Sequence, residues 1–460
     1  FYLNKIYKGA SMRNIVSSLK NSAKNFDKIA QLEKKLIPGS LLSRCGFTKE
    51  KGLSCKTIMT DLLLLCFENK SLYQKAGKDK EMSGNLKTYY LFLENAKHRW
   101  EKLLYEAAEK VVFEFSKLTD HSRHVLVVDD SLYERPYSKK VEMAAWQFDH
   151  ANHAHKMGFR FLTVGWTDGY SFVPLRFRLV SSRKTQTVPD GYDKRTLAYR
   201  RRADALKKMT DSAIEFLEKA KSLGAQYVAC DSWFSNPKTI RQIKDLGYDV
   251  VSHIKSNYIC FFDNGLHKAD YIRRHLDRSK EWCDLSGAQN INPNIEVLGS
   301  AKVTFKKGND PIRLLFCRLK NSKNPREIAI IACTDMSLSA VEILELYAKR
   351  WSIEVFFKTC KGFLGFEDDS RALNYDTLVA SKTICLLRYI LITYNQRFDE
   401  DHRTFSEMFY LFCDSIEDMC ALNVAWELLF AFYDMTKEIA ITCIDDFFAL
   451  FKNFIRDLAH

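Results

Sequence analysis

Apolar and polar residues alternate with two different periodicities along the chain. Up to about residue 120, apolar groups recur every three to four positions, as in CKTIMTDLLLLCFEN, which predicts amphipathic helices. From His124 onward, short runs such as HVLVVDDS, FRFLTVGW and AQYVACDSWFS have the pattern of strands. Residues 194–224 have helical spacing and end in a glycine. The predicted order from His124 to about residue 256 is β-β-β-α-β-α-β.

Later in the chain, strands give way again to helices. Residues 257–334 contain loop-like sequence and several strand patterns, which indicate a β-rich insertion. Residues 338–365 have the spacing of one long helix, with Ser337 or Ser339 as its cap and Gly362 or Gly365 at its end. Residues 372–460 return to helical spacing. The pattern predicts an α/β protein with a mixed-sheet core, an insertion and helical regions on both sides.

One side of the predicted long helix carries four polar residues. At about 100° per residue, Tyr347, Arg350, Glu354 and Lys361 fall within an arc of roughly 60°. A solvated helix face with a Glu354–Lys358 pair would explain the same pattern. The alternative is a site in which a carboxylate is flanked by two cations and a phenol.

Composition narrows the class of protein. With 460 residues, 46% of them hydrophobic, the chain is large enough for several subdomains. Its apolar runs are too short for a membrane span and the N-terminus has no signal-peptide pattern, so we expect a soluble, cytoplasmic protein without a membrane partner. The 13 cysteines include no C-x-x-C pair, which favours buried, reduced thiols over a disulfide framework or a zinc ribbon.

Charge is distributed unevenly. The net charge is +13, but residues 367–460 hold 8 Lys and Arg against 17 Asp and Glu, a net −9 that leaves +22 for the rest. This asymmetry predicts a polyanionic partner, of which nucleic acid is the obvious example. A basic run before and within the helix of residues 194–224 is expected to contact the DNA backbone, although a solvated face is the plainer reading: Arg183, Arg195, Arg200, Arg201, Arg202, Lys207 and Lys208.

Two other groups have less specific patterns. His150, His153 and His155 precede a strand without a nearby cysteine, so a loop facing DNA or solvent is favoured over a zinc site. Trp233 and Phe234 are expected to pack beneath a site rather than stack on bases.

Three acids have the order that two-metal phosphodiester cleavage requires. Asp129 or Asp130 ends the first strand, Asp231 ends a later strand, and Glu354 lies on the long helix. Such cleavage needs carboxylates from distant parts of the chain around two ions about 3.5–4 Å apart. Oxygen ligands suit Mg²⁺ or Mn²⁺. A single strand-end aspartate is more often a turn or cap residue, but three in a compatible order are more specific.

The spacing Y-(2)-R-(3)-E-(6)-K resembles the signature of the type-four family of bacterial insertion-sequence transposases, of the DDE class. VVDDS is similar to the first-acid block of that family, ACDSWFS to its second-acid block, and HKMGFRFLTVGWTDGYSFVPLRFRL to its strand pair. The likeness covers roughly residues 124–370.

The resemblance implies a ribonuclease-H-like architecture with defined parts. These would be a helical DNA-end-binding domain at 1–120, the catalytic core at 121–256 and 335–371, the β-rich insertion at 257–334 and a helical dimerisation region at 372–460. The protein would be a DNA transposase of the nucleoid that works as a homodimer on double-stranded DNA. It would cut at terminal inverted repeats and transfer the 3′ ends to target DNA.

The resemblance also implies roles for individual residues. Asp129, Asp231 and Glu354 would hold Mg²⁺ or Mn²⁺, with Asp129 preferred to Asp130 because D-x-[ST] matches Asp129 and Ser131. Arg350 and Lys361 would contact phosphates, Tyr347 would position the strand end, and Trp282 is a candidate for stacking on a flipped base. Two alternatives stay open: a DNA-binding protein that no longer cuts, and a nuclease of the same core that acts on branched DNA.

Overall fold

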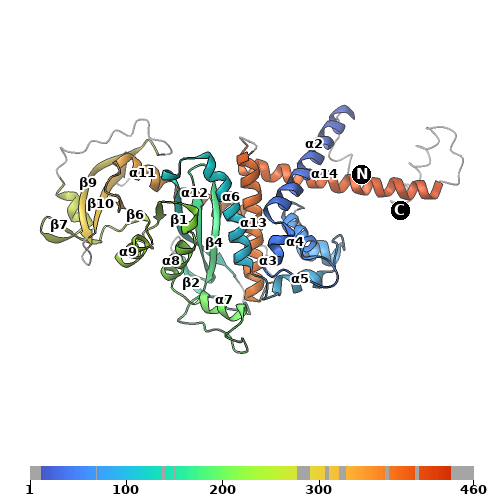
Figure 1. Ribbon diagram of the computed structural model, residues 1–460, viewed down its shortest axis with the longest axis horizontal. Coiled ribbons are helices and arrows are strands. Elements are labelled where there is room, and N and C mark those ends of the chain that lie inside the picture. The colour runs from blue at the N-terminus through green and yellow to red at the C-terminus, as the bar shows by residue number, and fades with distance from the viewer. Residues whose placement is uncertain are drawn as a thin grey trace.

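The computed structural model is a mixed α/β protein, which confirms the predicted class. It describes residues 12–68, 70–136, 140–149, 152–276, 291–305, 310–320, 328–367, 372–398 and 403–436. A sheet core lies between a β-rich end, where β9 and β10 stand, and a helical end, from which the long helix α14 projects (Figure 1).

The core of the sheet is built around β1 (Val125–Glu134), whose first residues are wholly buried. β1 pairs antiparallel with β3 (Ala154–Thr167) and parallel with β5 (Tyr227–Cys230), and β5 pairs parallel with β6 (Asp249–Ile254). β4 (Phe172–Val180) adds to the other side of β3, which also pairs with the short β2 (Ala145–Asp149). The order β4-β3-β1-β5-β6, three antiparallel strands followed by two parallel ones, is consistent with a ribonuclease-H-like core.

The β-rich region continues this sheet. β11 (Ala329–Cys333) pairs antiparallel with β6, so the segment predicted as a separate insertion returns to the core through its last strand. Outward from β11, the sheet continues through β10 (Pro311–Leu319), β9 (Ile295–Phe305), β7 (Ile259–Phe262) and β8 (Gly265–Lys268), followed by the helix α10 (Ala269–Arg274). The described strands thus form one 11-stranded sheet.

Two groups of helices pack on the core. The first comprises α7 (Leu197–Ala205), α8 (Met209–Lys219) and α9 (Pro237–Asp245), which come between the core strands in the chain. The second comprises α6 (Trp100–Phe115), α11 (Ala340–Ala348), α12 (Trp351–Phe363) and α13 (Tyr375–Phe398). α13 is the one described helix long and apolar enough to cross a membrane, and 94% of its most apolar stretch is buried within the protein, as in a core helix.

The helical regions at the two ends of the chain pack against each other. α2 (Met12–Leu36) contacts α14 (Phe405–Thr436), where the Ser22 hydroxyl donates a hydrogen bond to Asp418 at 2.6 Å. Arg388 of α13 donates to the carbonyl oxygens of Leu62 and Leu63. The remaining helices of this body are α3 (Gly39–Arg44), α4 (Cys55–Leu64), α5 (Leu86–Glu94) and the short turns Leu65–Glu68 and Tyr73–Lys78. The described parts of the two regions, residues 12–120 and 372–436 with their gaps, therefore pack together.

Two helices predicted as continuous are divided. Residues 194–224 form α7 and α8, and residues 338–365 form α11 and α12. At the second break the amides of Arg350 and Ile353 bond to carbonyls three residues back, so the helix tightens for one turn. Ser339 caps α11 in a reciprocal box with Glu342, as the sequence allowed, and Gly365 follows α12 at a φ of 72°.

A buried ion-pair network corrects the prediction for two arginines of the basic run. Arg202 makes a bidentate pair with Glu142, at 2.6 and 2.7 Å, and both Arg201 and Arg202 bind Asp376 of α13, at 2.5 and 2.8 Å. Arg201 is 6% exposed and Arg202 0%. These guanidinium groups join α7 to α13 and are neutralised by carboxylates within the fold. The sequence shows their charge but not the acid 174 residues away that neutralises it.

We predict that Asp376→Asn lowers the free energy of unfolding by about 3–5 kcal/mol, because it removes the one buried carboxylate that both guanidinium groups share. Arg202 keeps Glu142 and Arg201 keeps only the longer pair with the partly exposed Glu101. Urea denaturation monitored by circular dichroism measures the change. Arg195→Gln, which removes a cation from a pair at the surface, is the control and should leave the midpoint where it is. Equal midpoints for the two variants would show that the network contributes nothing.

Candidate active site

Asp129 and Asp231 come from neighbouring parallel strands. The pairing of β1 with β5 ends at Val128 and Cys230. The next residue of the chain after each of these is one of the two acids, and Asp231 directly follows the end of β5. Asp129 lies within β1 rather than at its end, since β1 continues to Glu134 against β3. The sequence analysis placed this acid at the end of the first strand. In the structure it lies instead where the parallel pairing of β1 with β5 ends.

Arg350 connects Asp129 to the third acid. Its Nη1 lies 3.1 Å from Oδ2 of Asp129, and its Nη2 lies 2.5 Å from Oε1 of Glu354, which is in the first turn of α12. Arg350 itself is the residue immediately before α12, at its N-cap position. One guanidinium group thus joins the sheet to the helix and brings the first and third predicted acids to the same place.

The electrostatics of the site follow from crowded acids in a partly buried position. Burial raises the pKa of Asp129 to about 7, and the charge of Asp130 adds to this, while Arg350 opposes it; Asp231 contributes a smaller increase. Burial by itself would lower the pKa of Arg350, but its anionic neighbours Asp129 and Glu354 help to raise it above its usual value. Arg350 therefore keeps its charge.

The geometry distinguishes Asp129 from Asp130. Asp130 is paired with Arg160 on the adjacent strand β3, and its side chain is 6% exposed. Successive side chains on a strand point to opposite faces, so only one of the two can point toward α12. Asp129 is the one that contacts Arg350 there. This arrangement supports Asp129 as the acid of the site.

Tyr347 and Lys361, the other two residues of the polar side of the predicted long helix, lie at different distances from Arg350. Tyr347 ends its helix next to Arg350, whose guanidinium lies 5.6 Å from the centre of the phenol ring, and burial raises the pKa of Tyr347 to about 12. Lys361 is exposed, and its Nζ donates to the carbonyl oxygen of Leu132 at 2.8 Å. Leu132 is three residues beyond Asp129, or about 10 Å along the strand. Tyr347, Arg350 and Glu354 are grouped, and Lys361 stands further along.

Two family matches cover this arrangement. Residues 45–278 match the family described as DDE superfamily endonuclease, and residues 180–391 match the family described as transposase DDE domain. The first match includes Asp129 and Asp231, and the second includes Asp231 and Glu354. The chain belongs to the DDE superfamily. No curated protein shows significant similarity to it.

Members of the DDE superfamily use divalent metal ions, and the donor set of this DDE protein suits them. Asp129, Asp231 and Glu354 supply only carboxylate oxygens, the ligands that Mg²⁺ and Mn²⁺ prefer. Among the residues that the structure describes, no three acidic, histidine or cysteine side chains are close enough together to hold an ion as they stand. Arg350 explains this, because its guanidinium lies between two of the acids. A cation that replaced it there would also stabilise the ionised form of Asp129.

His253 is a member of the site that the sequence analysis missed. Its Nδ1 lies 3.9 Å from Oδ1 of Asp231, and burial lowers its pKa. Ser252 of β6 pairs with Cys230, the last residue of β5, and His253 and Asp231 are the residues that follow them. The signal in the sequence is a histidine near the end of the third parallel strand, which becomes informative only when the register is known.

Five other residues singled out in the sequence have different outcomes. Phe234 is buried, as expected, but Trp233 is 50% exposed and does not pack beneath the site. The rings of His155 and Phe148 meet edge to face, with ring centres 5.3 Å apart. His150 and Trp282 lie outside the described residues.

Manganese binding tests the assignment of the acids. We predict that Asp129→Asn and Asp231→Asn each lower Mn²⁺ affinity by at least about tenfold, because each removes a charged ligand. Asp130→Asn should stay within about twofold, since that carboxylate is engaged by Arg160. Isothermal titration calorimetry on protein verified as folded measures both. If Asp130→Asn lost Mn²⁺ affinity and Asp129→Asn kept it, Asp130 rather than Asp129 would be the metal ligand.

Proposed function

We propose that this DDE protein is a cut-and-paste DNA transposase of the type-four family, which binds transposon ends, cleaves them and joins the freed 3′ ends to target DNA. The observation that carries the proposal is the meeting of Asp129 and Glu354 at Arg350, with Asp231 directly after the strand that pairs with β1. The spacing of Tyr347, Arg350, Glu354 and Lys361 supports the choice of family.

In this mechanism the chain supplies ligands and positive charge. Asp129, Asp231 and Glu354 would hold two divalent ions, which when bound supply a water nucleophile near neutral pH and neutralise charge on the phosphate. Arg350 would exchange a carboxylate for a phosphate oxygen of the strand being cut, because a planar guanidinium matches both anions. Tyr347, with its proton firmly held, would donate a hydrogen bond beside Arg350.

Phosphate contacts away from the cut would come from exposed cations. Lys361 projects from the far part of α12, and Arg200 is exposed on α7, whereas Arg201 and Arg202 belong to the buried network. The projecting helix α14 (Figure 1), with Trp426 63% exposed, would supply a dimer contact. The partners would then be double-stranded DNA and a second copy of the chain.

Cleavage of DNA bounded by the inverted repeats that flank the gene tests the proposal. With Mg²⁺, the protein should excise the fragment by double-strand breaks, and Glu354→Gln should slow cleavage by about a thousandfold, because several kcal/mol of transition-state stabilisation would be lost. Binding of the ends, measured by gel shift, should change little.

Lys358→Gln, on an exposed position of the same helix, is the matched control and should cut as the parent does. Binding without cutting by the parent protein would favour the alternative of a DNA-binding protein descended from a transposase. Nicking that ignores the repeats would favour a nuclease that does not transfer strands.

A further inference from the structure

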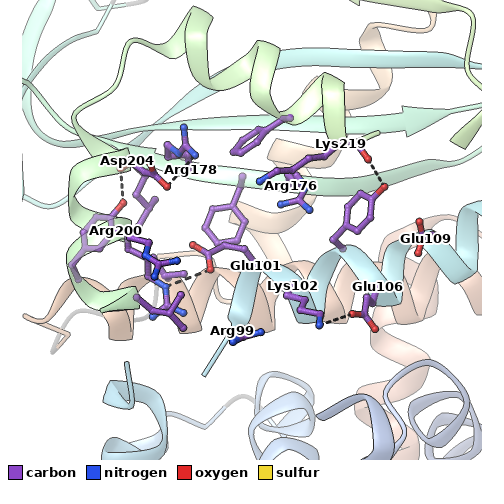
Figure 2. A pocket seen from close by; sticks show the side chains of 18 of the residues that line it. Arg99, Glu101, Lys102, Glu106, Glu109, Arg176, Arg178, Arg200, Asp204 and Lys219 are labelled. Carbon is purple, nitrogen blue, oxygen red and sulfur yellow. Dashed lines mark hydrogen bonds and ion pairs between the residues drawn. The ribbon is translucent and has the colours of Figure 1, made fainter. Parts of the chain in front are cut away.

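A cavity of about 730 Å³ lies along β4, between α6 on one side and α7 and α8 on the other (Figure 2). β4 is the outer strand of the core, with β3 between it and β1. No residue of the candidate active site lines the cavity. Its volume is within the range of about 300–1,000 Å³ typical of sites for small ligands.

The acids that line the cavity already have partners. Glu101 is paired with Arg201 at 3.4 Å, Glu106 with Arg44 at 2.9 Å, and Asp204 with Lys207 at 2.8 Å. Glu109 accepts a hydrogen bond from Ser222 at 3.5 Å. The carboxylates are therefore largely used in holding the wall together.

Several cations around the same cavity have no such partner. Within the described part of the chain, no carboxylate lies in ion-pair distance of Arg99, Lys110, Arg176, Arg200 or Lys219. Arg200 makes one hydrogen bond, from its Nη2 to the carbonyl oxygen of Arg195 at 2.9 Å. The cavity thus carries an excess of positive charge that its own walls do not neutralise.

Arg176 is the most constrained of these cations. Its guanidinium stacks on the ring of Tyr105, 4.4 Å from the ring centre, and its Nε is buried without a hydrogen-bond partner. Burial lowers the pKa of Arg176, and burial together with the charge of Arg176 lowers the pKa of Lys219. Tyr105 is fixed in turn by a hydrogen bond from its hydroxyl to the carbonyl oxygen of Lys219, at 2.7 Å. A rigid, partly buried and unpaired cation is costly unless an anion joins it.

We propose that this cavity binds phosphate groups, with Arg176 as the inner contact and the exposed Lys219, Arg200 and Arg99 around it. A guanidinium held flat against a ring presents its fork to a tetrahedral oxyanion. The several cations and the volume suit a ligand with more than one phosphate. Such phosphates could come from a free oligophosphate or from consecutive positions of a DNA backbone. The second source rests on the proposed function, and the first does not.

Calorimetry with inorganic tripolyphosphate, without divalent metal, tests the free ligand. We expect Arg176→Gln to weaken binding by at least about tenfold and Lys219→Gln by about three- to tenfold, since each removes a charge-assisted contact. Lys221→Gln removes the same charge two residues from Lys219 without lining the cavity, and should leave affinity within about twofold. Lys219 is exposed, so its variant remains informative even where Arg176→Gln fails to fold.

A fluorescent DNA duplex tests the backbone source, again without metal. If phosphates of DNA enter the cavity, the slope of log affinity against log salt should fall by about 0.9 for each contact removed by Arg176→Gln or Lys219→Gln, and not for Lys221→Gln. Weakened tripolyphosphate binding with an unchanged DNA slope would assign the cavity to a free oligophosphate. If neither ligand distinguishes these variants from the control, the proposal is wrong. Because no readout depends on cleavage, a chain that does not cut would leave this test intact.

Discussion

The position of Glu354 depends on an ion pair between a helix and a strand. α12 is bound to β1 near both of its ends, through Arg350 to Asp129 and through Lys361 to the carbonyl oxygen of Leu132. Burial and the charge of Asp130 raise the pKa of Asp129, and Arg350 opposes this rise, so the cation favours the ionised form of the acid. Arg350 therefore holds the candidate site together while the acids carry no other counter-charge.

The sequence was informative where a feature depends on neighbouring residues. Period-two runs located the core strands, and the sequence offered Ser337 or Ser339 as the cap of the helix that begins there, of which the structure selects Ser339. The order of Asp129, Asp231 and Glu354 was also visible, because strands that follow one another in an α/β chain usually lie near one another. Features that depend on distant partners were not visible. The pairing of β11 with β6 and the approach of His253 to Asp231 both require the register of the sheet.

The charge of the sequence was the least reliable indicator of a DNA-binding surface, because it too depends on partners that are distant in the chain. A run of arginines looks alike in the sequence whether it faces DNA or a buried carboxylate. Arg201 and Arg202 bind Asp376, while the adjacent Arg200 stays exposed. Part of the positive charge of the first four-fifths of the chain is thus neutralised by α13, which belongs to the acidic remainder. The positive charge left for a partner is smaller and more localised than the sequence total suggests.

Two arginines in the wall of the cavity differ in whether a carboxylate neutralises them, and this difference distinguishes a structural role from a binding role. Arg178 is held by Glu215 and Ser212. Arg176, two residues earlier on the same strand, lies over the ring of Tyr105, and no described carboxylate is within ion-pair distance of it. Two arginines at alternate positions of a strand face the same side. Both side chains therefore lie on the same face of β4, where a carboxylate next to Arg176 would have neutralised it as Glu215 neutralises Arg178. The aromatic support instead keeps the Arg176 guanidinium ordered and open to a ligand, which is the arrangement expected of a binding residue rather than of one that only joins elements of the fold.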